Sequence, residues 1–217
     1  MKTVSLRTLF LGTFIPLVLV TLLAGLVAGW VSNTVPRLYV QSKAESVIAR
    51  LDGEVMSYIQ PVMTNIDDFV RFGTMTDDPQ VLEALTIALG ADLSYVISFY
   101  YTTEDFHTGT GSGFYVGNDG WLPPDDWVPR ERGWFRNALS HSGQIAYEDA
   151  YVDAMTGDLC LTVAKTVTDS SGTLRGVVAV DLLLSNLVKM ASTFSVSPRS
   201  SLYLVAADGS YITHTDE

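Results

Sequence analysis

The stretch YVDAMTGDLCLTVAKTV, residues 151–167, has the pattern of a β-hairpin. Its residues alternate on both sides of Thr156-Gly157, and side chains of a strand point to opposite faces with a period of two. This alternation around a glycine-containing turn predicts two antiparallel strands. Tyr151 and Asp153 then share one face, so that a phenol and a carboxylate lie side by side.

The sequence on both sides of this hairpin predicts further strands and short helices. Aromatic and β-branched residues, punctuated by glycines, predict strands at 94–104, 109–117, 144–167, 174–184 and, as a terminal hairpin turning at Asp208-Gly209, 201–213. Helical patterns lie at 81–89, behind the capping turn Asp77-Asp78-Pro79, and at 131–140 and 185–194. The sum is a mostly antiparallel sheet with short helices in its connections.

The N-terminal region predicts a membrane anchor. Residues 8–31 contain no charge, and about twenty apolar residues in a helix span the hydrocarbon core of a bilayer. Lys2 and Arg7 precede this span, which places the short N-terminus in the cytoplasm by the positive-inside tendency. Trp30 occupies the position of an interfacial anchor at the outer end. The rest of the chain is therefore expected outside the cytoplasmic membrane.

A long helix is expected to follow the anchor, from about residue 32 to 73. Apolar residues recur mostly at steps of three and four, and Pro61 is expected to kink this helix or to mark a break. The apolar stripe has two interpretations, which can both hold because a long helix has several faces. It packs against the core of the following domain, or it forms a dimer seam.

The composition limits the partners and the chemistry. The formal net charge is −11, which argues against nucleic acid as a partner because phosphate binding needs a basic surface. The single cysteine, Cys160, cannot form an internal disulfide. The three histidines show no metal-ligand spacing, and no serine lies in a nucleophile elbow. We therefore expect no enzyme, no metal and no cofactor.

One acid interrupts an otherwise apolar strand, GVVAVDLLL at 176–184. Burying an unpaired carboxylate is costly, so Asp181 needs a partner or water. It has two interpretations. Asp181 lies at the end of the strand and caps the helix near Ser185, or it faces a polar pocket that receives a cation.

Positively charged and indole side chains cluster at the start of the helix predicted at 131–140. Arg130, Arg132 and Trp134 lie close in sequence there, and a guanidinium binds a carboxylate with two parallel hydrogen bonds. Taken alone, they are better explained as a surface ion pair for the arginines and a core anchor for the tryptophan. Together with Asp153 and Asp181, which offer charge to an ammonium, they fit a zwitterionic ligand.

Three motifs resemble the double-Cache sensor domain of bacterial receptors: PRERGWF (129–135), YVDAMTG (151–157) and GVVAVDL (176–182). Such domains lie outside the membrane in chemoreceptors, sensor kinases and cyclic-dinucleotide enzymes. The resemblance covers about residues 32–217. It implies an α/β fold of the PAS-like Cache type with a transmembrane helix, a long stalk helix, an antiparallel-sheet membrane-distal module and an incomplete membrane-proximal module.

In the amino-acid-binding subset of this family, an aromatic residue precedes an arginine by five positions, Arg-x-Trp-Tyr follows, and Tyr-x-Asp and a later Asp complete the site. By that resemblance the ligand-binding residues here are Trp127, Arg132, Trp134, Phe135, Tyr151, Asp153 and Asp181. The resemblance implies that Trp127, Arg132 and Trp134 hold a carboxylate. It implies that Tyr151, Asp153 and Asp181 hold an amine. Trp127 replaces a tyrosine of the pattern, and Phe135 lacks the hydroxyl of another.

The resemblance also implies a function and an organisation. The expected function is a membrane-anchored extracytoplasmic sensor of the chemotaxis-receptor type that binds a small ligand, with an amino acid first. The alternatives are a sensor of an amine or another small polar ligand in a histidine kinase or diguanylate cyclase, and a dimerisation module that binds no small molecule. The expected location is the cell inner membrane, with the sensor in the periplasm or outside the cell, and a homodimer is expected.

The expected domain boundaries follow from the same comparison. They are a cytoplasmic N-terminus at 1–7, a transmembrane helix at 8–31, the long helix of the sensor at 32–75, a membrane-distal ligand-binding module at 76–195 and the start of a membrane-proximal module at 196–217.

Overall fold

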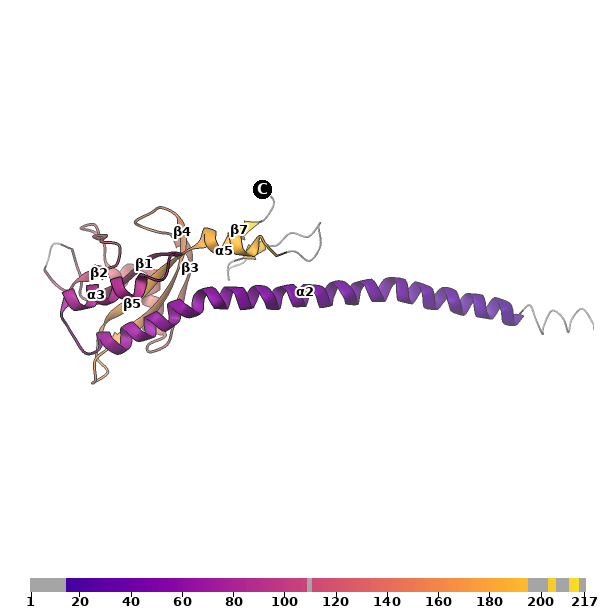
Figure 1. The fold of residues 1–217 in the computed structure, drawn as a ribbon, viewed down its shortest axis with the longest axis horizontal. Helices are drawn as coiled ribbons and strands as arrows, with labels where there is room; N and C mark the ends of the chain where they lie inside the picture. The colour runs from indigo at the N-terminus through magenta and orange to yellow at the C-terminus, as the bar shows by residue number, and fades with distance from the viewer. Residues whose placement is uncertain (1–14, 109–110, 195–202, 206–210, 215–217) are drawn as a thin grey trace, which may run out of the picture. The chain divides into compact units, whose positions relative to one another are not determined.

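A single helix, α2 (Ile15–Gly73), opens the part of the chain that the computed structural model describes, which comprises residues 15–108, 111–194, 203–205 and 211–214 (Figure 1). The chain divides into two units, Met1–Arg50 and Leu51–Glu217, and α2 contributes to both. Searching the described residues finds no helix that is both long and apolar enough to cross a membrane. The predicted span at 8–31 begins before the described range.

Five antiparallel strands form the sheet of the second unit. They are β1 (Val96–Thr103), β2 (Tyr115–Gly117), β3 (Ala146–Val152), β4 (Leu159–Thr168) and β5 (Leu174–Leu183). Their order in the sheet is β2-β1-β5-β4-β3, so β5 is central and pairs with β1 and β4. The predicted antiparallel sheet is therefore confirmed.

The hairpin predicted at 151–167 is formed by β3 and β4. Tyr151 pairs with Cys160, and Gly157 adopts a φ of 77° in the turn, a conformation that glycine adopts without steric cost. One detail of the prediction is wrong. Strand β3 ends at Val152, so Asp153 belongs to the turn and not to the strand.

The two faces of the sheet have different cores because side chains alternate along each strand. On the face covered by the end of α2 and by α3 (Pro79–Gly90), helices and strands together supply large core side chains: Val62, Ile66, Phe69, Leu82, Phe99, Tyr101, Val163, Val178, Val180 and Leu182. The opposite face packs against α4 (Gly133–Ser140) and holds Tyr100, Trp127, Trp134, Phe135, Ala138, Ala146, Ala164, Val177 and Ala179. Three of the sheet positions on this second face are alanines, which pack in one buried cluster with the side chains of α4.

Helix α2 continues through Pro61 to Gly73, so no break occurs there. Val62, Ile66 and Phe69 follow the proline and are fully buried. Their burial contributes about 1.5–3 kcal/mol per side chain, which offsets the hydrogen bond that proline cannot make. The interpretation of the apolar stripe as core packing is thus confirmed for the last turns of the helix.

The remaining elements agree with the sequence in type but not in all bounds, and β2 (Tyr115–Gly117) is much shorter than the strand predicted at 109–117. The Asp78 carboxylate caps α3 by accepting a hydrogen bond from the Gln80 amide at 3.0 Å, as the capping turn predicted. Helix α4 begins at Gly133 rather than at 131, because the short 3-10 helix η2 (Pro129–Glu131) ends in the extended backbone of Arg132. Helix α5 (Leu184–Ala191) follows β5 directly.

The C-terminal hairpin is present as two short strands. Strand β6 (Tyr203–Val205) pairs antiparallel with β7 (Tyr211–His214), as the sequence predicted. The predicted turn at Asp208-Gly209 lies outside the described residues.

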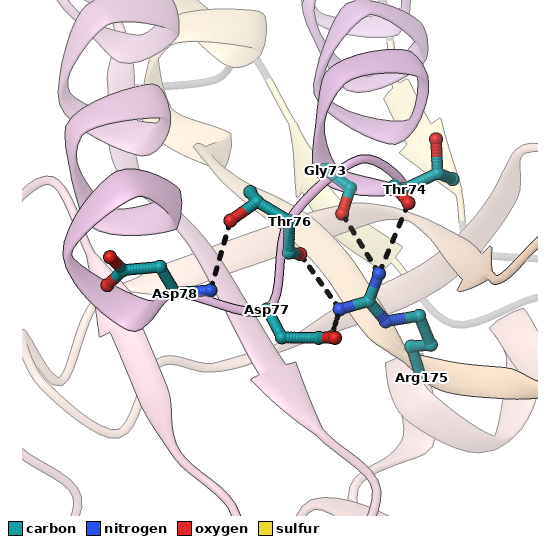
Figure 2. A network of polar contacts seen from close by, with 6 residues as sticks. All are labelled: Gly73, Thr74, Thr76, Asp77, Asp78 and Arg175. Carbon is teal, nitrogen blue, oxygen red and sulfur yellow. Dashed lines mark hydrogen bonds and ion pairs between the residues drawn. The ribbon is translucent and has the colours of Figure 1, made fainter.

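The end of α2 is held by one side chain of the sheet, Arg175 of β5. Its guanidinium donates to the carbonyl oxygen of Gly73, the last residue of α2, at 3.5 Å and to those of Thr74 at 3.3 Å and Thr76 at 2.8 Å, and it forms an ion pair with Asp77 (Figure 2). The last carbonyls of a helix have no partner within the helix, and the helix dipole favours a positive charge at that end. Arg175 meets both requirements and fixes α2 to the central strand.

We expect Arg175→Ala to lower the free energy of unfolding by about 2 kcal/mol, because several hydrogen bonds to a charged donor are lost. Arg71→Ala is the matched control, since Arg71 forms an ion pair with Asp68 at an exposed site and should cost less than about 1 kcal/mol. Urea unfolding followed by circular dichroism measures both. Equal losses in the two variants would contradict the role given to Arg175.

Candidate functional site

A cavity of about 230 Å³ opens on the α4 side of the sheet. It lies between the strands, the start of α4 and the β3–β4 turn. Its lining includes Ser98, Tyr100, Tyr115, Asp119, Trp121, Trp127, Glu131, Arg132, Trp134, Glu148, Tyr151, Asp153, Met155 and Asp181. Six of the seven residues expected from the sequence lie in this lining, and Phe135 does not.

The buried carboxylate of Asp181 is the centre of a hydroxyl network. Its Oδ1 accepts hydrogen bonds from Thr162 at 2.6 Å, Tyr100 at 3.2 Å and Tyr151 at 3.3 Å. Thr162 lies directly opposite Asp181 in the ladder between β4 and β5, and its hydroxyl is also 2.7 Å from that of Tyr151. Three side chains from three strands thus converge on the carboxylate of a fourth strand.

Burial raises the pKa of the Asp181 carboxyl group. Asp181 is only 4 % exposed, and its burial raises the pKa to about 7, with the charge of Asp153 acting in the same direction. The hydrogen bonds from Thr162, Tyr100 and Tyr151 lower the pKa but do not outweigh the burial. A cation in the cavity would stabilise the charged form of this group.

The helix-capping interpretation of Asp181 is wrong. Asp181 lies inside β5, two residues before its end, and the N-cap of α5 is Leu183, which makes no side-chain capping hydrogen bond. The side chain of Asp181 shares a face with Ala179, and this face is the one toward α4. The alternation of the strand therefore directs the carboxylate into the cavity.

The β3–β4 turn supplies the second buried acid. The Oδ1 atom of Asp153 accepts hydrogen bonds from the Thr156 amide at 2.7 Å and hydroxyl at 2.8 Å, which hold the turn together. Asp153 is 8 % exposed and lines the cavity next to Tyr151. Tyr151 and Asp153 thus lie side by side in the cavity lining, as the sequence predicted. The β3–β4 turn, and not strand alternation, positions Asp153.

Arg132 provides the positive charge of the lining. Its backbone joins η2 to α4, and its Cζ lies 5.4 Å from the ring centre of Trp127, which is a cation–π contact. The Nε atom of Arg132 is buried and has no hydrogen-bond partner among the described residues. An unpaired buried donor is costly, so the site is incomplete without an acceptor at this point. Arg130 instead pairs with Glu104 at the surface.

Aromatic rings form the wall around Arg132. Trp127 lies 6.3 Å from Trp134 and 5.7 Å from Tyr115, and Tyr115 lies 5.5 Å from Trp121, all between ring centres. Phe135 is fully buried and packs on Trp134 at 5.6 Å, outside the lining. Successive residues of a helix differ by about 100° in direction, so Trp134 and Phe135 cannot both face the cavity.

Several lining residues were not predicted from the sequence. Tyr100 and Ser98 come from β1, and Ser98 pairs with Asp181 in the ladder, a relation that depends on strand order and register. Tyr115 and Trp121 come from β2 and the loop after it. The alternation in β1 could have indicated that Tyr100 faces away from Phe99 and Tyr101, but not that it meets Asp181.

The cavity lies in a segment that matches a known family. Residues 82–189 match the family model described as the first PDC sensor domain of methyl-accepting chemotaxis protein-like proteins. This segment is a PDC/Cache-like sensor domain. The resemblance inferred from the three motifs is thereby confirmed, and the chain is homologous to the sensor domains of chemotaxis receptors.

Individual relatives agree with the family. The methyl-accepting chemotaxis protein McpB of Bacillus subtilis is 27% identical over 124 residues, which are 57% of this chain and 18% of McpB. The ligand-binding domain of the Pseudomonas aeruginosa amino acid chemoreceptor PctB, solved in complex with L-Arg, matches with a TM-score of 0.62 and 25% identity over 75% of this chain and 65% of that chain. The domain of PctC from the same organism, in complex with GABA, matches with a TM-score of 0.63 and 21% identity over 79% and 74%.

These matches cover only part of the full-length relatives. The chain spans about a fifth of the length of the curated relatives it matches first. The named relatives are chemotaxis receptors, and their ligand-binding domains are sensors rather than enzymes.

The raised pKa of Asp181 predicts a pH dependence of stability. Between about pH 4 and 7 the folded protein keeps this carboxyl protonated, whereas the unfolded chain releases the proton. The contribution of Asp181 to the free energy of unfolding therefore falls as the pH rises through this window, and it is constant above pH 7. Asp181→Asn removes this contribution and retains an oxygen that accepts the three hydroxyls.

Urea unfolding of the parent chain and of Asp181→Asn at several pH values from 4.5 to 8 measures this effect. The difference, parent minus variant, should fall from pH 4.5 to 7 and then level off. Other titrating groups are common to both proteins and cancel in this difference. Parallel stability curves would show that the pKa of Asp181 does not change on folding.

Proposed function

We propose that this chain is the sensory part of a chemotaxis receptor and that its cavity binds an α-amino acid. The observation that carries this proposal is the charge arrangement of one cavity, in which Arg132 has a buried donor without an acceptor and Asp181 is a buried acceptor for a cation. An α-amino acid supplies both missing groups, a carboxylate and an ammonium. The relative solved in complex with L-Arg, an α-amino acid, supports a ligand of this kind.

In the proposed complex, Arg132 and the indole groups of Trp127 and Trp134 bind the ligand carboxylate. A guanidinium presents a planar fork to a carboxylate, and its stacking on Trp127 limits the side-chain entropy lost on binding. Tyr151, Asp153 and Asp181 bind the ammonium, with Tyr100 as a further oxygen. Phe135 supports Trp134 from behind and makes no direct contact with the ligand.

The membrane anchor expected at 8–31 is part of the proposal. The described apolar side chains of this region are exposed, among them Leu22, Leu26 and Trp30, with exposed fractions of 60%, 73% and 66%. Exposed leucines on successive turns are costly in water and favourable in lipid. The proposed arrangement places 1–7 in the cytoplasm and the sensor, including the module at 76–195, on the outer side of the inner membrane.

Signalling in this proposal uses a homodimer and the long helix. A ligand shifts a conformational equilibrium by the difference between its affinities for the two states. In the chain, the proposed long helix, 32–75, joins the membrane anchor to the sensor module. The proposed start of a membrane-proximal module, 196–217, follows the sensor module on its other side. The receptor output then lies in a further domain of the full-length protein.

Titration calorimetry and thermal shift on the full chain in lipid nanodiscs test the ligand class. We expect at least one L-amino acid to bind and to raise the melting temperature, and its decarboxylated amine to bind more weakly because it leaves Arg132 unpaired. Asp181→Asn should lower the affinity for that amino acid by about 2 kcal/mol, or about 30-fold, because an uncharged group replaces the carboxylate that holds the ammonium.

Two controls keep this test decisive. Asp125→Asn alters an exposed acid outside the lining and should leave the affinity unchanged. The melting temperature of Asp181→Asn without ligand reports on folding separately from binding. The proposal fails if no amino acid binds the parent chain, or if Asp181→Asn folds and binds as tightly as the parent.

A further inference from the structure

The charge of the cavity is strongly unbalanced. Five carboxylates line it, those of Asp119, Glu131, Glu148, Asp153 and Asp181, against the single guanidinium of Arg132. With a proton on Asp181, four carboxylates still face one guanidinium. A zwitterionic amino acid with a neutral side chain uses one carboxylate group and one ammonium, and it leaves this excess of negative charge in place.

The acids lie at two depths. Asp181 and Asp153 are buried, with exposed fractions of 4% and 8%. Glu148 is half-buried, whereas Asp119 and Glu131 are exposed. The inner pair belongs to the proposed ammonium site. The outer three have no role in binding the backbone groups of an amino acid.

Tyr115 lies between the inner and outer acids. Its ring stacks on that of Tyr100 at 5.5 Å, and Tyr100 donates to Asp181. Burial raises the pKa of Tyr115 first, and the charges of Asp119 and Asp181 raise it further, so that both acids lie within electrostatic reach of its hydroxyl. The cavity is thus continuous from the inner carboxylate to the outer ones.

The outer region combines a carboxylate with aromatic surfaces. Asp119 accepts a hydrogen bond from the Trp121 amide at 2.8 Å, and the Trp121 ring meets Tyr115 edge to face at 5.5 Å. An organic cation is attracted both to ring faces and to the carboxylate. A metal ion fits less well, because no three acidic, histidine or cysteine side chains of the described residues are grouped as metal ligands.

Resting on the function proposed above, we infer that the site selects amino acids whose side chain carries a second positive charge, with its end directed to Asp119. The carboxylate then binds at Arg132 and the α-ammonium at Asp181. The side-chain cation occupies the outer region between Trp121, Tyr115 and Asp119. Dibasic amino acids of the lysine and ornithine type are the chemical class that meets all three requirements.

Titration calorimetry of the full chain in nanodiscs with L-lysine and L-norleucine tests this inference. Norleucine has a linear side chain without the terminal ammonium. We expect L-lysine to bind about tenfold more tightly at low salt, since several partly exposed charges each contribute a modest attraction. In about 0.5 M NaCl the difference should narrow because salt screens exposed charges.

Variants of the outer acids locate the effect. Asp119→Asn should weaken L-lysine binding about two- to fivefold and leave L-norleucine binding unchanged, whereas Glu148→Gln, beside the start of α4, should have a smaller effect on L-lysine. Asp119→Asn keeps the oxygen that accepts the Trp121 amide, and Glu148→Gln keeps an oxygen for Asn137, so both should fold. Asp125→Asn, a nearby exposed acid outside the lining, should change neither affinity.

The outcomes separate this inference from the function on which it rests. If neutral amino acids bind as tightly as L-lysine, the selectivity is wrong and the amino-acid site stands. If the outer variants weaken lysine and norleucine equally, those acids do not recognise the side chain, and the inference is also overturned. If no amino acid of any charge binds, the function proposed for the cavity fails and the selectivity fails with it.

Discussion

The structure of the site depends on one constraint, the burial of the Asp181 carboxylate in the central strand. A carboxylate at this depth must be protonated, solvated or surrounded by donors. Thr162, Tyr100 and Tyr151 supply hydroxyl donors from three of the four other strands, β4, β1 and β3. Each of those strands must keep its register for these hydrogen bonds to form. The geometry of the site therefore depends on the register of the sheet.

The two faces of the sheet are packed differently. Toward α2 and α3 the sheet presents large side chains such as Phe99 and Val180, which belong to the larger core cluster. Toward α4 it presents Ala146, Ala164 and Ala179, which pack in one buried cluster with Phe135 and Trp134, and the cavity opens beside this cluster. The same strands therefore provide a hydrophobic core on one side and a binding site on the other.

Much of this arrangement could be predicted from the sequence, because strand alternation and helix periodicity are local properties. They give the strands, the Asp78 cap and the opposite directions of Asp181 and Val180. They do not give strand order or register, which depend on contacts between distant segments, and so Tyr100 and Thr162 were missed. Phe135 was assigned by resemblance to a ligand contact, but the turn of α4 buries it behind Trp134. Asp153 was assigned to a strand, but its own side chain closes the turn.

Strand β5 carries two attachments on one rigid segment. Asp181 connects it to the hydroxyl network of the cavity, and Arg175, six residues earlier, connects it to the end of α2. A strand at about 3.3 Å per residue separates these points by about 20 Å, and paired strands on both sides keep it from bending. A small translation of β5 along its axis would therefore move Asp181 and Arg175 together, and Arg175 would move the end of α2 with it.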